Sequence, residues 1–378
     1  MTSTPASRQL SVRSISTPEH LDFVRSRSSV SFLQTPAWAT VKNEWRGESI
    51  GWFRGETLVG AALVLYRQLP KLQRYLAYIP EGPDIDWFDS RLDDWLTPMA
   101  AHLKKQGAFG IRMGPPVVMR RWNAATIKAA IADPVLTSLS DVPADVSDDA
   151  ALGLRQSLKK LGWKELDASG GFTAGQPKFN FQIPLADRSE DDVLAGMNQL
   201  WRRNIKKAAK LGVEVTTGTK ADLSAFHEVY AETAVRDHFT PRPLSYFERM
   251  WDALNAEEPD RLVLYLAHHE GDLVASTTMV RVGQHAWYSY GASTTAKRDV
   301  RGSNAIQWQM IRDAMAAGAT IYDMRGITET IDPDDSHAGL IQFKVGTGGE
   351  AVEYLGEWDL PLNRALYLGF TAYMRSRG

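Results

Sequence analysis

The strongest constraint on the fold is a pattern that occurs twice along the 378 residues of the chain. Each copy has two apolar runs joined by a glycine-containing turn, which predicts a β-hairpin. Each copy then continues with an aromatic strand, a helix that ends at a glycine and another short strand. Leu58 matches Leu273, 215 residues later, and Gly107 matches Gly318, 211 residues later, so the copies repeat nearly in register.

Two copies of hairpin, third strand, crossover helix and fourth strand predict two related α/β domains, each with a mixed sheet. This element order is that of the acyl-CoA N-acyltransferase (GNAT-like) fold. We therefore expect tandem GNAT-like domains at 1–170 and 171–357, with the segment 358–378 packing on the first. The first copy predicts strands at 50–53, 75–79 and 109–113 and a helix at 92–106, and the second predicts strands at 262–267, 287–290 and 320–324 and a helix at 304–317.

The composition excludes several kinds of chemistry. The chain has no cysteine, which rules out a disulfide framework, a cysteine nucleophile, a Cys-ligated zinc and an iron–sulfur cluster. The histidines lack metal-ligand spacing, so we predict no metal site. The net charge of −2 gives no overall attraction to nucleic acid, and any such contact requires a local basic patch. No apolar run is long enough to span a membrane and no signal-peptide pattern is present, so we expect a cytoplasmic protein.

The clearest helix in the sequence is predicted over 189–211. Ser189 is a typical N-cap, acidic residues follow it in the first turn, and Gly212 ends the helix. Its apolar face is expected to contain Val193, Met197, Leu200, Trp201 and Ala208. Its other face carries Arg202, Arg203, Lys206, Lys207 and Lys210. Such a basic face either binds the phosphates of a nucleic acid or is simply solvated.

Two further segments carry candidate charge chemistry. The loop 297–305 precedes the helix of the second copy, where GNAT enzymes bind the diphosphate of coenzyme A. Gly302 fits that role, but Asp299 would repel a diphosphate, so the loop argues against an acyl-CoA donor. In the segment 339–349, Lys344 is predicted to lie between an apolar strand and a glycine-rich turn. It is either an edge-strand lysine or a fixed cation beside an acyl or phosphate oxygen.

Several short motifs also occur in one order along most of the chain. They are Phe32–Trp38, Pro80–Pro83, Arg202–Ala208, Tyr290–Ser293, Gly339–Lys344 and Gly356-Glu357. On these motifs the chain resembles the Fem (FemABX-type) family of aminoacyl-tRNA-dependent peptidyltransferases, which build the interpeptide bridge of peptidoglycan. Some members carry a coiled-coil arm. Here Gly212–Thr219 leads directly to the next predicted helix, so the chain resembles the subtype without that arm.

The resemblance implies transfer of an aminoacyl group (Gly, Ala or Ser) from aminoacyl-tRNA to the stem-peptide amine of UDP-MurNAc-pentapeptide or lipid II. The aminoacyl-tRNA is a co-substrate, and no cofactor is implied. A lipid-linked acceptor would bring the enzyme to the inner face of the cytoplasmic membrane as a peripheral protein. Three alternatives remain open: tRNA-dependent transfer to a peptide natural product, N-acyl transfer from acyl-CoA, and non-catalytic RNA binding.

The resemblance also implies roles for residues that bind the acceptor. Lys42 would bind the acceptor's diphosphate. Arg242 and Tyr246, four residues apart and so expected on one helical face, would form the second part of that site. Tyr78 and Tyr290 occupy equivalent positions in the two copies and would line the acceptor channel. The family usually has a basic residue where this chain has Glu81, which predicts altered contacts with the stem peptide.

The remaining roles concern catalysis and the tRNA. Phe343 and Lys344 would form the catalytic pair, with Lys344 holding the terminal phosphate of the tRNA or the developing oxyanion. Asp84 is the candidate base for the proton of the attacking amine. The basic helix is then expected to bind tRNA through Arg202, Arg203, Lys206, Lys207 and Lys210.

Overall fold

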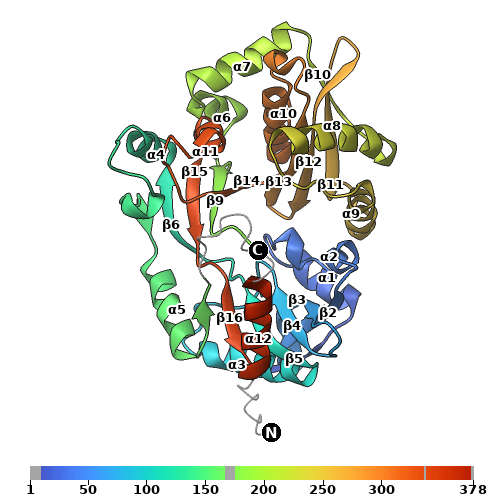
Figure 1. The fold of residues 1–378 in the computed structure, drawn as a ribbon, viewed down its shortest axis with the longest axis vertical. Helices are drawn as coiled ribbons and strands as arrows, with labels where there is room; N and C mark the ends of the chain where they lie inside the picture. The colour runs from blue at the N-terminus through green and yellow to red at the C-terminus, as the bar shows by residue number, and fades with distance from the viewer. Residues whose placement is uncertain (1–9, 167–174, 336–337, 376–378) are drawn as a thin grey trace, which may run out of the picture. The chain divides into compact units, whose positions relative to one another are not determined.

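The computed structural model describes residues 10–166, 175–335 and 338–375. The chain divides into two compact units, and each contains one mixed β-sheet (Figure 1). Unit 1 comprises Met1–Arg120, Ser147–Lys178 and Glu353–Gly378, and unit 2 comprises Arg121–Val146 and Phe179–Val352. Unit 1 therefore draws on both halves of the chain.

Unit 1 is built on a seven-stranded sheet with the order β1-β2-β3-β4-β5-β16-β8. Neighbouring strands are antiparallel except β4 and β5, which are parallel because α3 crosses over between them. The elements of this unit are β1 (Leu10–Ser14), α1 (Thr17–Arg25), α2 (Ala37–Val41), β2 (Arg46–Arg54), β3 (Thr57–Gln68), β4 (Tyr75–Ile79), α3 (Leu92–Lys105), β5 (Ala108–Met113), α5 (Asp149–Lys160), β8 (Lys164–Glu165), β16 (Trp358–Pro361) and α12 (Arg364–Arg375).

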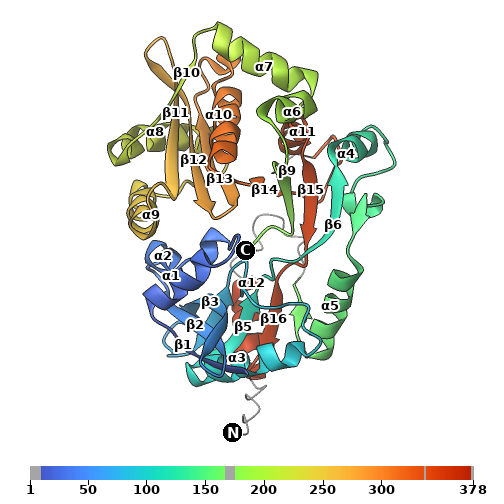
Figure 2. The same ribbon diagram turned by 180° about the vertical axis from the view of Figure 1, so that it is seen from behind.

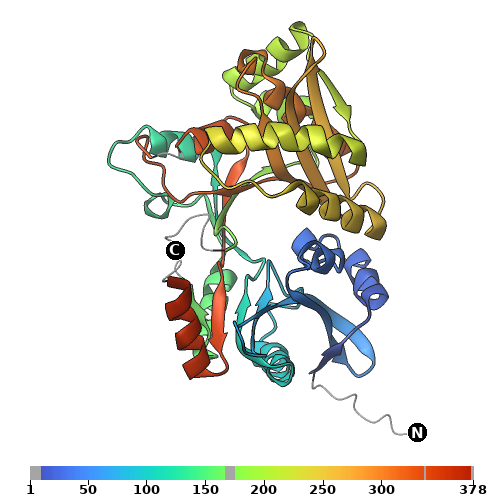
Figure 3. The same ribbon diagram turned by 45° about the vertical axis from the view of Figure 1, so that its right-hand side comes forward.

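The two faces of this sheet hold different clusters. Ala77 on β4 belongs to the main core, which includes apolar residues of α3 and α5. Its neighbour Leu76 faces the other way, because side chains alternate along a strand, and packs with Phe109 and with Phe370 of α12. Figure 3 shows α12 alongside β16. Helices α1 and α2 pack near the first strands of the sheet. Helix α1 contacts β2 and β3, and α2 contacts β2.

Unit 2 is built on a nine-stranded sheet with the order β10-β11-β12-β13-β14-β9-β15-β6-β7. Strands β13 and β14 are parallel on either side of the crossover helix α10. Helix α10 covers one face of this sheet and α8 covers the other (Figures 1 and 2). The elements are β6 (Val118–Asn123), α4 (Ala124–Ile131), β7 (Val146–Ser147), β9 (Phe179–Pro184), α6 (Glu190–Gly196), α7 (Gln199–Lys210), β10 (Glu214–Thr217), α8 (Leu223–Arg236), α9 (Leu244–Glu257), β11 (Leu262–His269), β12 (Asp272–Val282), β13 (His285–Ser293), α10 (Gly302–Ala316), β14 (Ile321–Ile327), α11 (Ala338–Val345) and β15 (Glu350–Tyr354).

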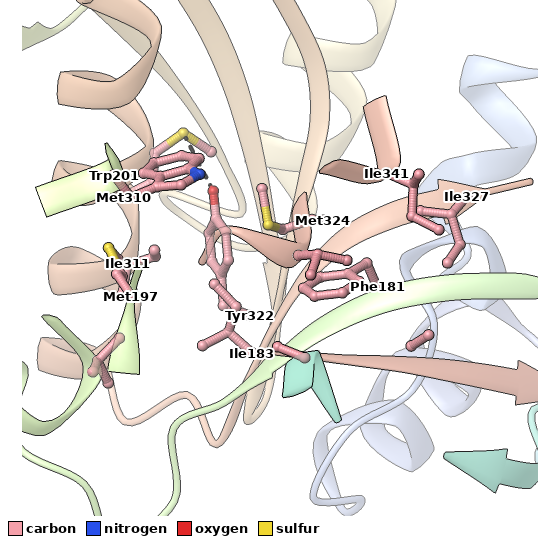
Figure 4. Close-up of a cluster of buried hydrophobic side chains, with 14 of the residues drawn as sticks. Phe181, Ile183, Met197, Trp201, Met310, Ile311, Tyr322, Met324, Ile327 and Ile341 are labelled. Carbon is pink, nitrogen blue, oxygen red and sulfur yellow. Dashed lines mark hydrogen bonds between the residues drawn. The ribbon is translucent and has the colours of Figure 1, made fainter. Parts of the chain in front are cut away.

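The core of unit 2 joins the sheet to α7, α10 and α11. Figure 4 shows Phe181 of β9, Tyr322 of β14 and Met310 of α10 in one cluster of buried side chains. Burial of each such side chain contributes about 1.5–3 kcal/mol relative to exposure. The Tyr322 hydroxyl donates to Gln307 Oε1 at 2.7 Å, so its polar atom is satisfied inside the core.

The predicted repeat is confirmed within each unit. Both hairpins form, and their turns contain Gly55 and Gly271, whose φ angles of +63° and +84° suit glycine. Both hairpins also have a bulge at the same place, between Trp52 and Phe53 in one and between Ala267 and His268 in the other. The aromatic strand, the crossover helix and the parallel strand follow in both units. The α/β class with two related mixed sheets was therefore predictable.

The division into units differs from the predicted domains. The predicted boundary at 170 lies outside the described residues. Residues 121–146 belong to unit 2 and not to the predicted first domain, because Trp122 and α4 pack into the core of unit 2. Residues 353–357 belong to unit 1, where Leu355 is part of the core. The segment after them also packs on unit 1, since β16 pairs with β5 and α12 contacts β5.

Two predicted elements were wrong. The single helix over 189–211 is two helices, because Asn198 interrupts it and its side chain caps α7 by accepting a hydrogen bond from the Trp201 backbone N. Leu200 was assigned to the apolar face but is 56% exposed. The apolar run before Lys344 belongs to helix α11 and not to a strand, because a short apolar run fits a buried helix equally well.

Candidate functional site

A polar cluster centred on Tyr78 and Glu357 lies on the face of the unit 1 sheet that carries α12. Tyr78 is on this face because it alternates with Ala77, which faces the main core. Its hydroxyl donates to Glu357 Oε1 at 2.7 Å and accepts a hydrogen bond from Gln176 Nε2 at 3.2 Å. Glu357 is 6% exposed. The predicted channel residue Tyr78 is thus paired with a buried carboxyl group.

Burial controls the ionisation of this pair. It raises the pKa of Glu357 to about 7, although the Tyr78 hydrogen bond and the nearby Arg112 guanidinium act in the opposite direction. Burial and the Glu357 charge together raise the pKa of Tyr78 well above its usual value. Glu357 is therefore the partner that gains and loses a proton near neutral pH.

The backbone at residue 175 lies directly against the Glu357 carboxylate. A Cβ atom at Gly175, whose φ is +114°, would lie 2.2 Å from Glu357 Oε2, so the chain approaches the carboxylate as only glycine allows.

On the next strand, Arg112 makes two hydrogen bonds of 2.8 and 2.9 Å to Asp359, which is fully buried. Tyr367 of α12 donates to the same Asp359 at 2.5 Å. Arg112 is also the strand neighbour of Tyr78 in the β4–β5 register, which joins the two groups.

The predicted diphosphate residue Lys42 lies beside this cluster. It ends α2, and its carbonyl oxygen accepts a hydrogen bond from the backbone N of Trp45 at 3.0 Å. The Trp45 ring meets Tyr78 edge to face at 6.1 Å between centroids. Arg67 lies near the same tryptophan, with its guanidinium carbon 5.8 Å from the ring centroid. The structure therefore brings Lys42 and Tyr78 to one region of unit 1, with a second cation beside them.

Asp84, the predicted base, is held elsewhere on the sheet. Arg27 Nε lies 2.9 Å from Asp84 Oδ2, and Asp84 pairs with Ala61 through two backbone hydrogen bonds. Tyr78 pairs with Leu65, four residues further along the same strand, which corresponds to about 13 Å at 3.3 Å per residue. Burial raises the pKa of Asp84, and Arg27 opposes that rise. Its carboxylate is therefore engaged by an arginine and remote from Tyr78.

Unit 2 brings together Arg242, Tyr246 and Tyr290. The Tyr290 hydroxyl donates to the Tyr246 hydroxyl at 3.2 Å, and the Arg242 guanidinium carbon lies 5.3 Å from the centre of the Tyr246 ring. The expected common helical face is wrong: Arg242 precedes Pro243, which caps α9, and reaches the tyrosine from the loop. The predicted diphosphate residues are divided between the units, with Lys42 in unit 1 and this group in unit 2.

Lys344 is buried in unit 2, with 3% of its surface exposed. Its Nζ donates to the carbonyl oxygens of Gly326 at 2.6 Å and Arg325 at 3.2 Å. Arg325 has a φ of +64° and interrupts the pairing of β14 with β9, so Lys344 secures an irregular backbone segment. Burial lowers the pKa of Lys344 to about 7, against the attraction of the Asp323 carboxylate.

Asp323 anchors the polar network behind Lys344. It is 1% exposed and accepts hydrogen bonds from Gln182 Nε2 at 3.0 Å and from the Arg325 backbone N at 2.6 Å. His285 Nε2 lies 3.4 Å from Asp323 Oδ2, the oxygen that Gln182 also binds. Although burial acts against it, these contacts lower the pKa of Asp323 and keep it charged. A fixed negative charge near Lys344 favours the ammonium form of the lysine.

The other half of the predicted catalytic pair connects to the basic helix. The Phe343 ring lies 4.7 Å from the Trp201 ring, and Trp201 Nε1 donates to the Phe343 carbonyl oxygen at 2.8 Å. Trp201 belongs to α7, whose outer side carries the basic residues. Phe343 therefore packs directly on the helix that the sequence assigns to tRNA.

The basic residues of α7 do not form one uniform surface. Arg202 donates to the carbonyl oxygens of Ala195 and Met197, so it completes the end of α6. Lys207 lies 3.9 Å from Asp299. Arg203, Lys206 and Lys210 are exposed and point to a narrower basic patch than the five predicted residues.

The loop before α10 does not fit coenzyme A. Lys297, its first cation, is held by Glu270 at 3.1 Å and Asp272 at 2.9 Å. Asp299 stands in the same loop with three quarters of its side chain exposed. A diphosphate placed there would meet carboxylates, so this part of unit 2 lacks the anion site of a CoA-dependent enzyme.

Sequence reasoning missed the role of Glu357. Gly356-Glu357 was noticed as a motif, but the glutamate was given no chemistry. The available signal was an acidic residue between Leu355 and Trp358, both fully buried. An acid inside an apolar run has to be paired or protonated, which marks it as a candidate functional group. Arg112 and Asp323 were missed for the same reason.

No group of histidine, aspartate and glutamate side chains among the described residues is arranged to hold a metal ion. No helix among them has both the length and the apolar character needed to cross a bilayer.

Solved structures share this architecture. The crystal structure of FemX superimposes with a TM-score of 0.78 at 24% identity, over 94% of this chain and 98% of its own. A tandem GNAT protein from the clavulanic acid biosynthesis pathway superimposes with a TM-score of 0.52 at 11% identity, over 94% of this chain and 99% of its own. These likenesses identify the two related sheets as tandem GNAT-like domains.

Sequence comparison gives the family. The lipid II:glycine glycyltransferase of Staphylococcus aureus (strain MRSA252) is 25% identical to this chain, over 93% of each protein. The model of the FemAB family matches residues 15–271 and 265–375, which is nearly the whole chain. The match runs through both units and includes Tyr78, Lys344 and Glu357. The chain therefore belongs to the FemAB family.

Proposed function

We propose that this protein transfers an aminoacyl group from aminoacyl-tRNA to the stem-peptide amine of a peptidoglycan precursor. Membership of the FemAB family supports this transfer, and the activity named for the staphylococcal relative favours glycine and a lipid II acceptor. The observation that carries the proposal is the Tyr78–Glu357 hydrogen bond, with Lys42 in the turn whose Trp45 ring contacts Tyr78. A buried carboxyl group with a pKa of about 7 suits a reaction that removes a proton from an amine.

In the proposed reaction the acceptor amine attacks the carbonyl carbon of the aminoacyl ester. The new C–N bond forms as the bond from that carbon to the ribose oxygen of the tRNA breaks. The proton lost by the nitrogen passes through the Tyr78 hydroxyl to Glu357. Glu357 then gives up this proton and the ribose oxygen takes up one as it leaves, so Glu357 is regenerated and the products are an amide and a hydroxyl. Because the ester is already activated, positioning and proton removal supply most of the catalysis.

Glu357 is a better proton acceptor than Asp84 in this scheme. The carboxyl group of Glu357 has a pKa of about 7, close to the pH at which a general base works best. Asp84 is paired with Arg27, and protonating it would break that ion pair. We therefore assign the proton to Glu357 and retain Asp84 as the second candidate.

Unit 2 supplies the groups that we assign to the donor. Lys344 as an ammonium ion has three N–H donors, and two of them bind the carbonyl oxygens of Arg325 and Gly326. The third remains for the terminal phosphate or the developing oxyanion. The contact of Phe343 with Trp201 places this lysine on the element next to α7, whose exposed cations we assign to the tRNA backbone.

The test is mass spectrometry of purified UDP-MurNAc-pentapeptide and lipid II after incubation with the protein. Each acceptor is supplied with glycyl-, alanyl- or seryl-tRNA, and a parallel sample is treated with RNase first. The expected result is a mass gain of one amino acid that RNase abolishes. A gain that survives RNase and requires an acyl-CoA, or no gain with any charged tRNA, would overturn the proposal.

A further inference from the structure

We infer that α12 and the turn between β3 and β4 form a docking surface for an anionic phospholipid bilayer beside the acceptor site of unit 1. We call the exposed side chains Lys71, Leu72, Arg74, Arg364 and Leu368 the docking surface. The inference rests on the proposed function and deepens it, because it selects a lipid-linked acceptor over a nucleotide-linked one.

The inner side of α12 is firmly seated. Phe370 is 8% exposed and packs with Leu76 and Phe109 on the sheet. Arg67 approaches the same Phe370 ring, with 5.7 Å from its guanidinium carbon to the ring centroid. Tyr367 is fixed by its hydrogen bond to Asp359. The helix therefore lies flat on unit 1 and presents a constant outer side.

That outer side and the neighbouring turn expose large apolar side chains. Leu368 is 67% exposed on α12, and Leu72 is 49% exposed in the turn. The two segments are neighbours, because Leu69 of the turn and Met374 of α12 pack against the same cluster as Phe370. Insertion of such exposed leucines into the headgroup region of a bilayer removes them from water and is favourable.

The charged residues in the two segments that carry these leucines are all basic. The sequence has no aspartate or glutamate from Arg67 to Pro80 or from Leu360 to its last residue, although acidic residues outnumber basic ones in the chain, 45 to 43. Lys71, Arg74 and Arg364 are exposed in these two stretches. Basic side chains flanking apolar ones fit a membrane that contains anionic lipid. RNA phosphates would pair with the cations but would leave the leucines exposed to water.

The docking surface adjoins the candidate acceptor site. Tyr367 of α12 binds Asp359, Asp359 binds Arg112, and Arg112 is the strand neighbour of Tyr78. A lipid-linked precursor holds its diphosphate at the level of the headgroups. A protein lying on the bilayer through α12 would present the Tyr78 region at that level, whereas a nucleotide-linked precursor would not need such a surface.

The first experiment measures sedimentation of the full chain with vesicles of phosphatidylcholine, with and without phosphatidylglycerol. Binding is expected only with the anionic lipid and should weaken with salt. The combined variant Lys71→Gln, Arg74→Gln and Arg364→Gln should bind up to about a hundredfold more weakly. Leu72→Ser with Leu368→Ser should weaken binding at every salt concentration.

Matched controls lie on the opposite face of the same sheet. Lys104→Gln with Lys105→Gln changes two residues of α3, and Leu152→Ser changes an exposed leucine of α5. These variants should bind like the wild type. Equal weakening by controls and docking-surface variants, or no binding of the wild type to anionic vesicles, would overturn the inference. Loss of tRNA binding with retained vesicle binding in the charge variant would assign the surface to RNA and overturn it as well.

The second experiment separates this inference from the proposed function. Transfer is measured with lipid II in vesicles and with UDP-MurNAc-pentapeptide in solution. The docking-surface variants should lose transfer to the embedded acceptor and keep whatever transfer the wild type shows to the soluble one. Equal loss on both acceptors would overturn the link to the lipid. Vesicle binding without transfer to either acceptor would overturn the proposed function and leave the docking surface standing.

Discussion

Tyr78 donates a hydrogen bond of 2.7 Å to Glu357, a residue 279 positions later in the chain. The contact joins β4 to the residue just before β16, and it stabilises the ionised form of a buried carboxyl group. Two predictions concern this pair directly.

The first prediction concerns the pH dependence of transfer. Proton removal needs ionised Glu357, so kcat should fall as the pH drops below about 7. Glu357→Gln should lower kcat by about 10²-fold and remove this acidic limb. Tyr78→Phe removes the hydroxyl that relays the proton, so it should lower kcat at every pH. It also deletes a hydrogen bond that lowers the pKa of Glu357, so the acidic limb of the remaining activity should move to higher pH. The measurement is kcat against pH for the three proteins; an unmoved limb in Tyr78→Phe would contradict the assignment.

The second prediction is that Glu357 reduces the stability of the folded protein. Its pKa rises from 4.5 to about 7 on folding, so stability is lost as the pH rises through this interval, by about 3 kcal/mol in total. Glu357→Gln should therefore unfold at higher urea concentration than the wild type at pH 8. The difference should vanish below pH 4.5.

Glu353 is the matched control for this measurement. It is also buried, but Lys178 lies 3.0 Å from its Oε1. Glu353→Gln should lower stability at pH 8, since it removes the charge that pairs with Lys178 and Arg120. Equal effects of the two substitutions would show that Glu357 is an ordinary structural acid.

The third prediction concerns Lys344. Its pKa of about 7 means that the ammonium form is lost as the pH rises past neutrality, so the rate of a step that needs this charge should fall on the alkaline side. Lys344→Arg keeps a charge at every pH and should remove the alkaline limb at a reduced overall rate. Lys344→Met should lower the rate by about 10²- to 10³-fold. Turnover of Lys344→Met close to that of the wild type would exclude the lysine from catalysis.

The fourth prediction concerns acid stability and involves His20 of α1. This side chain is 1% exposed, lies 2.7 Å from Ser49 Oγ through Nδ1, and burial lowers its pKa to about 4. Buried His20 binds a proton less readily in the folded protein than in the unfolded chain. The free energy of unfolding is therefore unaffected by His20 above pH 6.5 and falls by about 3 kcal/mol as the pH drops from 6.5 to 4. The loss should be smaller in His20→Asn, measured by urea unfolding at several pH values. The exposed His238→Asn serves as a control and should follow the wild type.

The fifth prediction concerns the basic helix. Replacing Arg203, Lys206 and Lys210 with glutamine should weaken aminoacyl-tRNA binding and reduce the slope of log K against log salt by about 2 to 3. Arg202→Gln should instead lower stability, because Arg202 binds the carbonyl groups at the end of α6. Filter binding over a salt series distinguishes the two effects. If Arg202→Gln alone changed the salt slope, our division of the helix would be wrong.

The fold was largely predictable because its signals are local. Gly55 and Gly271 mark the hairpin turns, and Gly107 and Gly318 mark the helix ends, where positive φ angles favour glycine. The placement of residues 121–146 was not predictable, because it depends on Trp122 packing against distant parts of unit 2. The break in the basic helix was visible as Asn198, a good N-cap, but the apolar residues on both sides suggested continuity.

The candidate site was predictable only in part. Tyr78, Lys42 and Lys344 were named through the family resemblance, and their surroundings came from the structure. The contact of Tyr78 with Glu357 and that of Arg112 with Asp359 join residues more than two hundred positions apart. No periodicity in the sequence reports such pairs. Likewise, the burial of Lys344 follows from the helix α11, which the sequence could not distinguish from a strand.

The position of β16 has a consequence for synthesis of the chain. This strand is inserted between β5 and β8, so the sheet of unit 1 cannot close until the ribosome has delivered residues 358–361. At roughly 5–20 residues per second, the early strands wait many seconds with an open edge, which is a period of exposure to aggregation and to chaperones. Glu357 and Asp359 arrive with this last strand. A prematurely terminated product therefore lacks the proposed proton acceptor.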